Sequence, residues 1–146
     1  MRVLVVYDSV FGNTQKVAEA IGGAMGGETK VVRAGQAALN NVGPIDMLVV
    51  GSPTLGGRPS QPVQDFLANI PEALVKGVKV AAFDTRYAGK FVKVFGFAAE
   101  KIADAMVAKG ARLAVPPQGF IVMGKKGPLK EGEQERAAAW AKGIAK

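Results

Sequence analysis

Short apolar runs alternate with longer amphipathic stretches along most of the chain. The apolar runs are mostly without polar alternation and predict strands buried on both faces of a parallel sheet, at residues 2–7, 30–33, 47–51, 78–83 and within 112–122. Apolar residues spaced three and four apart predict helices at 13–25, 62–70, 91–109 and 131–146, and glycine or proline ends the first three. A weaker crossover pattern occupies 36–42.

This alternation of strand and helix predicts an α/β fold in which helices cover both faces of a parallel sheet. We expect residues 1–146 to form one domain, since the length suits a single core and no linker or repeat interrupts it. Ligands of such sheets bind beyond the carboxyl ends of the strands, where the strand order reverses. The loops after the first, third and fourth predicted strands are therefore the candidate binding loops.

The 146 residues include no cysteine and no histidine. This composition excludes disulfides, thiolate catalysis, iron–sulfur ligation, the usual zinc sites and an imidazole general base. Redox chemistry would therefore have to come from a bound cofactor. No secretory signal is predicted, because the apolar start gives way at once to Asp8, Ser9 and Gly12, and no apolar run approaches the length of a membrane span. We expect a cytoplasmic protein that does not enter a membrane.

The net charge of +7 is concentrated in the second half of the chain. Up to Ala73 there are five Lys and Arg against six Asp and Glu, whereas from Leu74 onward there are fourteen against six. Such a field favours acidic partners at low salt. The alternative is an ordinary solvated helix surface, because many of these lysines sit at helical spacing among alanines. No basic motif interleaved with aromatic residues indicates nucleic-acid binding.

The loop after the first predicted strand contains Ser9, Val10, Phe11 and Gly12, and Asn13 and Thr14 open the helix that follows. Hydroxyls, a permissive glycine and the unpaired N–H groups of a helix start together favour a phosphate group. The alternative is a polar turn in which Asn13 or Thr14 only caps the helix. A Walker loop and a dinucleotide fingerprint are both excluded, because neither the Gly-Lys-Ser/Thr sequence nor the glycine triplet is present.

Two further loops carry candidate binding residues. Pro53, Thr54, Leu55, Gly56 and Gly57 follow the third predicted strand and combine a sharp turn with exposed backbone N–H groups and the Thr54 hydroxyl. The fourth strand is followed by Asp84, Thr85, Arg86 and Tyr87. Arg86 is either a cation for a bound ligand or the partner of Asp84 or Asp65 in a surface ion pair.

The first loop and its flanks resemble the flavodoxin signature. Its apolar, aromatic, hydroxyl and glycine positions are matched by Val5, Val6, Tyr7, Ser9, Gly12, Thr14, Ala18 and Ile21. The Gly51-Ser52-Pro53-Thr54 segment resembles the second flavin loop of that family, with Leu55 where an aromatic residue often stacks on the ring. The resemblance implies a flavodoxin-like doubly wound, five-stranded parallel sheet of order 2-1-3-4-5 in three layers, with flavin mononucleotide (FMN) as the cofactor.

The resemblance also implies a role for each loop. Residues 9–14 would bind the FMN phosphate, residues 53–57 one side of the flavin ring and residues 84–87 the other, with Tyr87 stacked on the ring and Arg86 near its pyrimidine end. A cation there would stabilise the negative charge that reduction builds on the ring. Leucine at position 55 offers apolar contact but no π face, so it would hold the ring less specifically than an aromatic residue.

The function implied is an electron carrier whose flavin cycles between its oxidised, semiquinone and hydroquinone forms. Familiar flavodoxins are acidic, so this basic chain is expected to dock an acidic redox partner protein, as a monomer or weak dimer. One alternative is an FMN-dependent NAD(P)H:quinone-type oxidoreductase. Another is a flavin-free interaction module that keeps the fold without the ligand.

Overall fold

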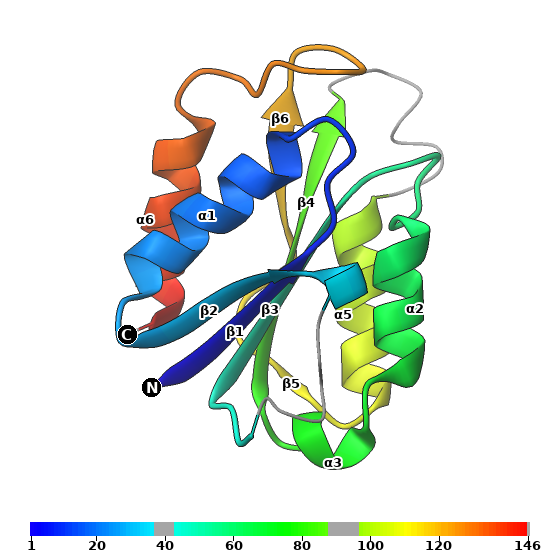
Figure 1. Cartoon of the computed structure of the whole chain (residues 1–146), viewed down its shortest axis with the longest axis vertical. Helices are drawn as coiled ribbons and strands as arrows, with labels where there is room; N and C mark the ends of the chain where they lie inside the picture. The colour runs from blue at the N-terminus through cyan, green and yellow to red at the C-terminus, as the bar shows by residue number, and fades with distance from the viewer. Residues whose placement is uncertain (37–42, 88–96, 146) are drawn as a thin grey trace.

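The computed structural model describes residues 1–36, 43–87 and 97–145. Its centre is a parallel β-sheet in which the strands follow the order β2-β1-β3-β4-β5, which confirms the predicted order, and a further strand, β6, pairs with β4 (Figure 1). The strands are β1 (Arg2–Tyr7), β2 (Glu28–Arg33), β3 (Met47–Pro53), β4 (Lys79–Tyr87), β5 (Arg112–Leu113) and β6 (Gln118–Val122).

Helices cover both faces of this sheet, so the predicted three layers are confirmed. In Figure 1, α1 and α6 lie on one face and α2 and α5 on the other. The helical elements are α1 (Asn13–Met25), the 3₁₀ turn η1 (Ala34–Gln36), α2 (Gln61–Asn69), α3 (Glu72–Val75), α5 (Ala98–Ala108) and α6 (Glu133–Ala145). None of these described helices has the length and apolarity needed to cross a bilayer.

The predicted fifth strand consists of two short strands that both pair with β4. Arg112–Leu113 runs beside Lys79 and Val80, and Gln118–Val122 runs beside Phe83–Tyr87. Between the two strands lies the Pro116-Pro117 pair. Proline has no N–H to donate to a neighbouring strand, so the ladder stops there and resumes further along.

Two predicted helix starts differ from the structure by more than one residue. The helix predicted at 91–109 begins only at Ala98, because Phe97 has an extended backbone (φ −131°, ψ 151°); residues 91–96 of that prediction lie outside the described residues. The last helix, predicted from residue 131, begins at Glu133 after a turn at 131–132. The weak pattern at 36–42 also lies outside the described residues, apart from Gln36 at the end of η1.

The core has one apolar layer on each face of the sheet. Val5, Val49 and Phe83 pack with α1 and α6, whereas their chain neighbours Val6, Val50 and Ala82 pack with α2 and α5. Consecutive strand side chains point to opposite faces, so a strand covered on both sides must be apolar at nearly every position. This is why the strands read as continuous apolar runs.

An aromatic cluster fixes the α6 side of the sheet. Phe83, Phe120 and Trp140 contact one another edge to face, with ring centroids 6.0–6.4 Å apart. Such T-shaped pairs add about 0.5–1.5 kcal/mol each beyond the area they bury. Trp140 is therefore a packing residue that holds α6 against β4 and β6.

The parallel registers bring several strand ends to one edge of the sheet. Tyr7 lies opposite Gly51, Pro53 opposite Thr85, and Tyr87 opposite Val122. The loops that leave β1, β3 and β6, together with the end of β4, therefore share one end of the molecule, at the top of Figure 1. This is the edge at which ligands of doubly wound sheets bind.

Candidate functional site

The loop after β1 is held by hydrogen bonds of its own and from β2. Gly12 precedes α1 with a φ of 92°, a left-handed conformation that glycine adopts without steric cost. Its N–H donates to Ser9 Oγ at 3.0 Å. Arg33 donates to the Ser9 carbonyl oxygen at 2.9 Å and to Asp8 Oδ1 at 3.4 Å. The loop therefore has a fixed shape before any ligand binds.

Gly12 occupies the position before α1 and none of the described side chains caps that helix, so the capping role considered for Asn13 or Thr14 is wrong. The first-turn N–H groups of a helix have no carbonyl partner within it and favour an anion. Thr14 Oγ1 instead lies 2.7 Å from Thr85 Oγ1, and both side chains are buried. This hydroxyl pair links the first turn of α1 to the end of β4.

The loop after β3 is a tight turn fastened at its base. Leu55 and Arg58 exchange two backbone hydrogen bonds of 2.8 and 3.1 Å, and the Thr54 N–H donates to the Thr85 carbonyl at 2.9 Å. Ser52 Oγ accepts from the Ser60 N–H at 2.8 Å. Leu55 at the tip remains 46% exposed, so it offers apolar surface to a ligand.

The end of β4 divides its predicted site residues between the two faces of the sheet. Thr85 and Tyr87 face the α1 side, where Thr85 meets Thr14 and Tyr87 is 53% exposed. Asp84 and Arg86 face α5, because side chains alternate along a strand. Arg86 therefore does not line the cavity in which Thr85 and Tyr87 lie.

Asp84 and Arg86 form a bidentate ion pair beneath α5. Arg86 donates from Nε and Nη2 to the two carboxylate oxygens at 2.8 Å each, and Asp84 Oδ2 also accepts from the Ala99 N–H at 2.9 Å. The guanidinium lies 3.5 Å from the centre of the Phe97 ring. Of the alternatives that the sequence left open, the ion pair with Asp84 is the one formed, but the carboxylate is fully buried rather than on the surface.

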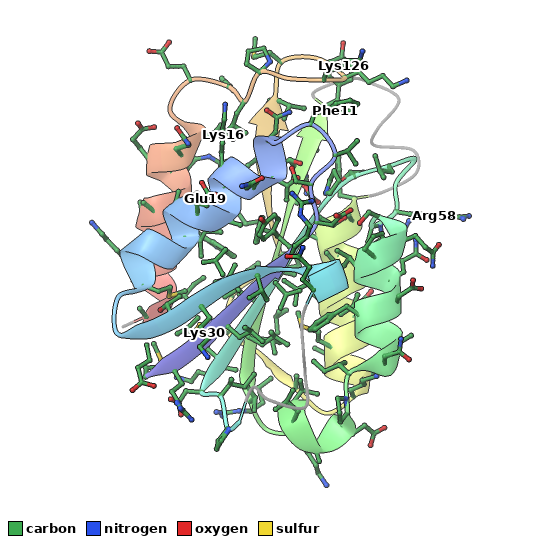
Figure 2. All side chains as sticks on the ribbon, viewed as in Figure 1. Phe11, Lys16, Glu19, Lys30, Arg58 and Lys126 are labelled. Carbon is green, nitrogen blue, oxygen red and sulfur yellow. The ribbon has the colours of Figure 1, made fainter. Side chains whose placement is uncertain are left out.

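A cavity of about 370 Å³ opens where these loops meet. It is lined by Ser9, Val10, Phe11, Asn13, Thr14, Pro53, Thr54, Leu55, Gly56, Thr85, Tyr87, Val122 and Lys125. Of the residues predicted from the sequence, Gly12, Gly57, Asp84 and Arg86 do not line it, although Gly12 shapes the loop that does. Figure 2 shows Phe11 and Lys126 at this end of the molecule.

Sequence reasoning missed the contribution of the loop after β6. Val122 and Lys125 line the cavity, and the loop is tied to the first one because Asn13 Nδ2 donates to the Lys126 carbonyl at 3.2 Å. Gly127 has a φ of 107°, which residues with a side chain rarely adopt, and a Cβ there would lie 2.8 Å from the Asn13 amide, so this position favours glycine. The signal available in the sequence was the Gly- and Pro-rich stretch 124–128 at the carboxyl end of a strand.

An ion pair at the start of α6 anchors this last loop. Arg136 donates to Glu133 Oε1 at 2.8 Å and to Oε2 at 2.7 Å, and the Ile121 N–H donates to Oε2 at 2.6 Å. These hydrogen bonds, first those from Arg136, hold the pKa of Glu133 below its usual value. The same pairing raises the pKa of Arg136. Both groups therefore stay charged and fasten β6 to α6.

The lining is matched to a ligand with an anionic end and an apolar body. Among the described lining residues no carboxylate occurs, Lys125 carries the one charge, and Ser9, Thr14 and Thr85 supply hydroxyls. Val10, Phe11 and Leu55 add exposed apolar surface at the mouth. Hydroxyls, a lysine and exposed apolar side chains lie in one cavity, a set of groups that could hold an aromatic molecule bearing a phosphate.

The fold and this cavity define an α/β protein with an open cavity at the carboxyl edge of its parallel sheet. Residues 4–126 match the family model described as Flavodoxin domain. The chain belongs to the flavodoxin family, as its motifs predicted. A comparison with curated proteins found no match.

Several solved flavodoxin structures share the fold. A flavodoxin from the domain Archaea superposes with a TM-score of 0.83 at 23% identity, covering 99% of this chain and 96% of that one. Flavodoxin 2 from Bacillus cereus gives 0.81 at 23% identity, with coverage of 99% and 98%. A WrbA-like flavodoxin from Agrobacterium tumefaciens gives 0.76 at 21% identity, with coverage of 99% and 94%. At these identities the likeness concerns the fold.

Proposed function

We propose that this chain binds FMN in the cavity at the carboxyl edge of the sheet and serves as an electron carrier. The observation that carries the proposal is the buried Thr14–Thr85 hydroxyl pair beside the uncapped start of α1. One hydroxyl of the pair donates to the other, which leaves the second O–H able to donate to a phosphate oxygen. Ser9 Oγ accepts from Gly12, so its own O–H is likewise available to an anion.

The remaining lining residues would hold the flavin ring. Leu55 and Gly56 come from one loop and Tyr87 from β4, and the exposed phenol ring gives the π face that Leu55 does not. Bound flavin would supply the one-electron chemistry, for which no acid, base or nucleophile of the protein is required. Lys125 would supply the positive charge that the sequence assigned to Arg86, because Arg86 is committed to Asp84.

Titration of the cofactor-free protein with FMN tests the proposal. We expect saturable binding with loss of flavin fluorescence and visible absorption bands in the complex, because the cavity pairs hydroxyl donors with an apolar mouth. Riboflavin, which lacks the phosphate, should bind more weakly and serves as the matched ligand control. Absence of a saturable complex would reject the flavin proposal. Rapid NAD(P)H oxidation with a quinone by the FMN complex would favour the oxidoreductase over the carrier.

The charge of the chain supports an acidic redox partner. Lys125 and Lys126 lie in the loop that borders the cavity, beside the exposed side chains of Phe11 and Met123. Cations beside an apolar patch steer acidic proteins to that patch, and salt screens the attraction. We expect the bimolecular rate of reduction by an acidic protein donor to fall as salt is added, measured by stopped flow. A rate independent of salt would contradict steering.

A further inference from the structure

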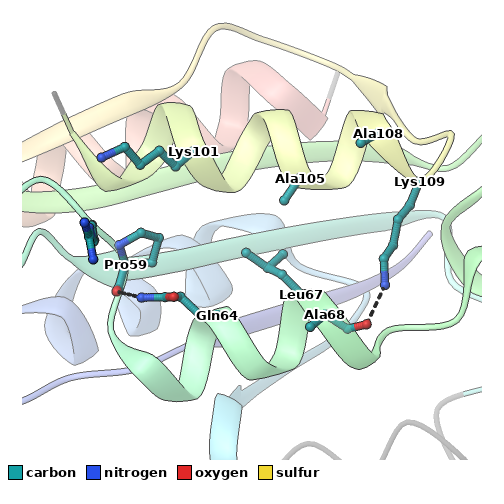
Figure 3. Close-up of a pocket in the computed structure, with 9 residues that line it drawn as sticks. Pro59, Gln64, Leu67, Ala68, Lys101, Ala105, Ala108 and Lys109 are labelled. Carbon is teal, nitrogen blue, oxygen red and sulfur yellow. Dashed lines mark hydrogen bonds between the residues drawn. The ribbon is translucent and has the colours of Figure 1, made fainter.

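A second hollow lies between α2 and α5, on the face of the sheet away from α1. It is a groove of about 540 Å³. Figure 3 draws the side chains that line it between the two helices. Leu67 and Ala68 of α2 line one wall, and Ala105 and Ala108 of α5 line the other. Within the part of the chain that the structure describes, the groove and the cofactor cavity have no lining residue in common, so the groove is a separate feature of the surface.

The groove has the dimensions of a short helix-binding site. Both helices follow parallel strands, so they run side by side in the same direction, and alanines at the contact leave room between them. Lys101 and Lys109 both line the groove. They are eight residues apart in the sequence, which corresponds to about 12 Å along the axis of α5. A third helix could lay about two turns of an apolar stripe against this floor.

Among the described residues that line the groove, all the charged ones are basic. Arg58 and Lys101 lie toward the start of the two helices, and Lys109 lies at the end of α5. Lys109 Nζ donates to the carbonyl oxygens of Ala68 and Ile70 at 3.0 and 2.6 Å, which orients the ammonium without cancelling its charge. The ion pairs formed among the described residues include neither Arg58 nor Lys109. Both ends of the apolar floor therefore carry positive charge.

We propose that this groove docks an acidic amphipathic helix of a partner protein. The partner helix would place a two-turn apolar stripe on Leu67 and Ala105, with carboxylates beyond each end of the stripe facing Arg58 and Lys109. The groove is an open hollow rather than an enclosed cavity, so a small ligand would stay partly in solvent there, whereas a helix would cover the floor. This docking site does not depend on the cofactor.

The turn after β3 contributes residues to both the groove and the cofactor cavity. Arg58 and Pro59 line the groove, whereas Leu55 and Gly56 of the same turn line the cofactor cavity. The backbone hydrogen bonds between Leu55 and Arg58 make that turn one rigid unit. A helix bound in the groove would therefore contact the protein next to the proposed electron-transfer site.

Fluorescence anisotropy with two designed helical peptides tests the proposal. Both peptides carry the same apolar stripe, one flanked by glutamates and the other by lysines. We expect saturable binding of the glutamate peptide and at least tenfold weaker binding of the lysine peptide. Arg58→Glu should weaken the glutamate peptide about tenfold, because an attraction at the rim becomes a repulsion. Ala105→Gln, which fills the floor without changing charge, should also weaken it.

Lys142→Glu on α6 is the matched control, since Lys142 is exposed on the opposite face and this change alters net charge as much as Arg58→Glu. It should leave binding within twofold. Equal binding of the two peptides, an equal effect of Lys142→Glu, or no saturable binding would overturn the proposal. The proposal would also be overturned if the wild-type protein formed a dimer and Ala105→Gln dissociated it, because a second copy of the chain would then occupy the groove. Anisotropy gives the same readout with or without FMN, so failure here is distinct from failure of the flavin proposal.

Discussion

Replacing Asp84 with alanine should lower the free energy of unfolding by about 3–5 kcal/mol, the cost of removing one partner from a buried ion pair. The Asp84 carboxylate is fully buried and accepts three hydrogen bonds, two from Arg86 and one from the Ala99 N–H. Its loss leaves the guanidinium of Arg86, which is only 20% exposed, without its counter-ion. Urea unfolding followed by circular dichroism measures the change.

Two further variants test whether the loss of stability comes from the unpaired guanidinium of Arg86. The double variant Asp84→Ala with Arg86→Met should recover part of the stability, because no unpaired cation remains under Phe97. Asp65→Ala on the exposed surface of α2 is the control, and we expect a change within about 0.5 kcal/mol. If Asp84→Ala cost no more than Asp65→Ala, the ion pair would contribute nothing measurable.

Changing Thr14 to valine should weaken FMN binding by about 1–3 kcal/mol, roughly fivefold to over a hundredfold, if its hydroxyl takes part in binding the phosphate. Valine has the shape of threonine, so the change removes the hydroxyl and keeps the packing of a side chain that is 1% exposed. FMN titration of the cofactor-free variant measures the loss. Thr14→Ser keeps the hydroxyl and should bind FMN close to the wild-type level.

Thr14→Val should affect stability as well as FMN affinity, because Thr14 also contacts Thr85. Valine at 14 leaves the buried Thr85 hydroxyl without the partner it has at 2.7 Å, so the variant should also lose some stability in the absence of FMN. A double-mutant cycle with Thr85→Val separates the two effects. Unchanged FMN affinity in Thr14→Val would mean that this hydroxyl serves only the contact with Thr85.

Local pattern was enough to find most elements and the three predicted loops. Helix α1 begins and ends where the apolar spacing and Gly26 indicate, and β1 matches its prediction residue for residue. The helix predicted at 91–109 was wrong at Phe97, whose backbone is extended although the apolar spacing continues through it. Phe97 lies against Arg86 of β4, and a contact between distant segments leaves no local signal.

The candidate site was also predicted only in part from the sequence. The hydroxyl and glycine pattern indicated the loop at 9–14, and the structure brings most of its side chains to the cavity. The direction of Arg86 could not be read from the sequence, because alternation along β4 separates Arg86 from Thr85 without saying which of them faces the cavity. Lys125 was missed because its loop reaches the cavity only through the pairing of β6 with β4.

The sequence by itself determined the α/β class, the parallel sheet and the place of the first loop at a cavity. These follow from hydrophobic period and turn chemistry, which act between residues close in the chain. Only the tertiary structure decided that Arg86 neutralises Asp84 and that Lys125 supplies the cavity's charge. It also joined Thr14 to Thr85 and set a basic groove between α2 and α5. Each of these depends on packing between segments far apart in sequence, where burial and charge pairing select one arrangement.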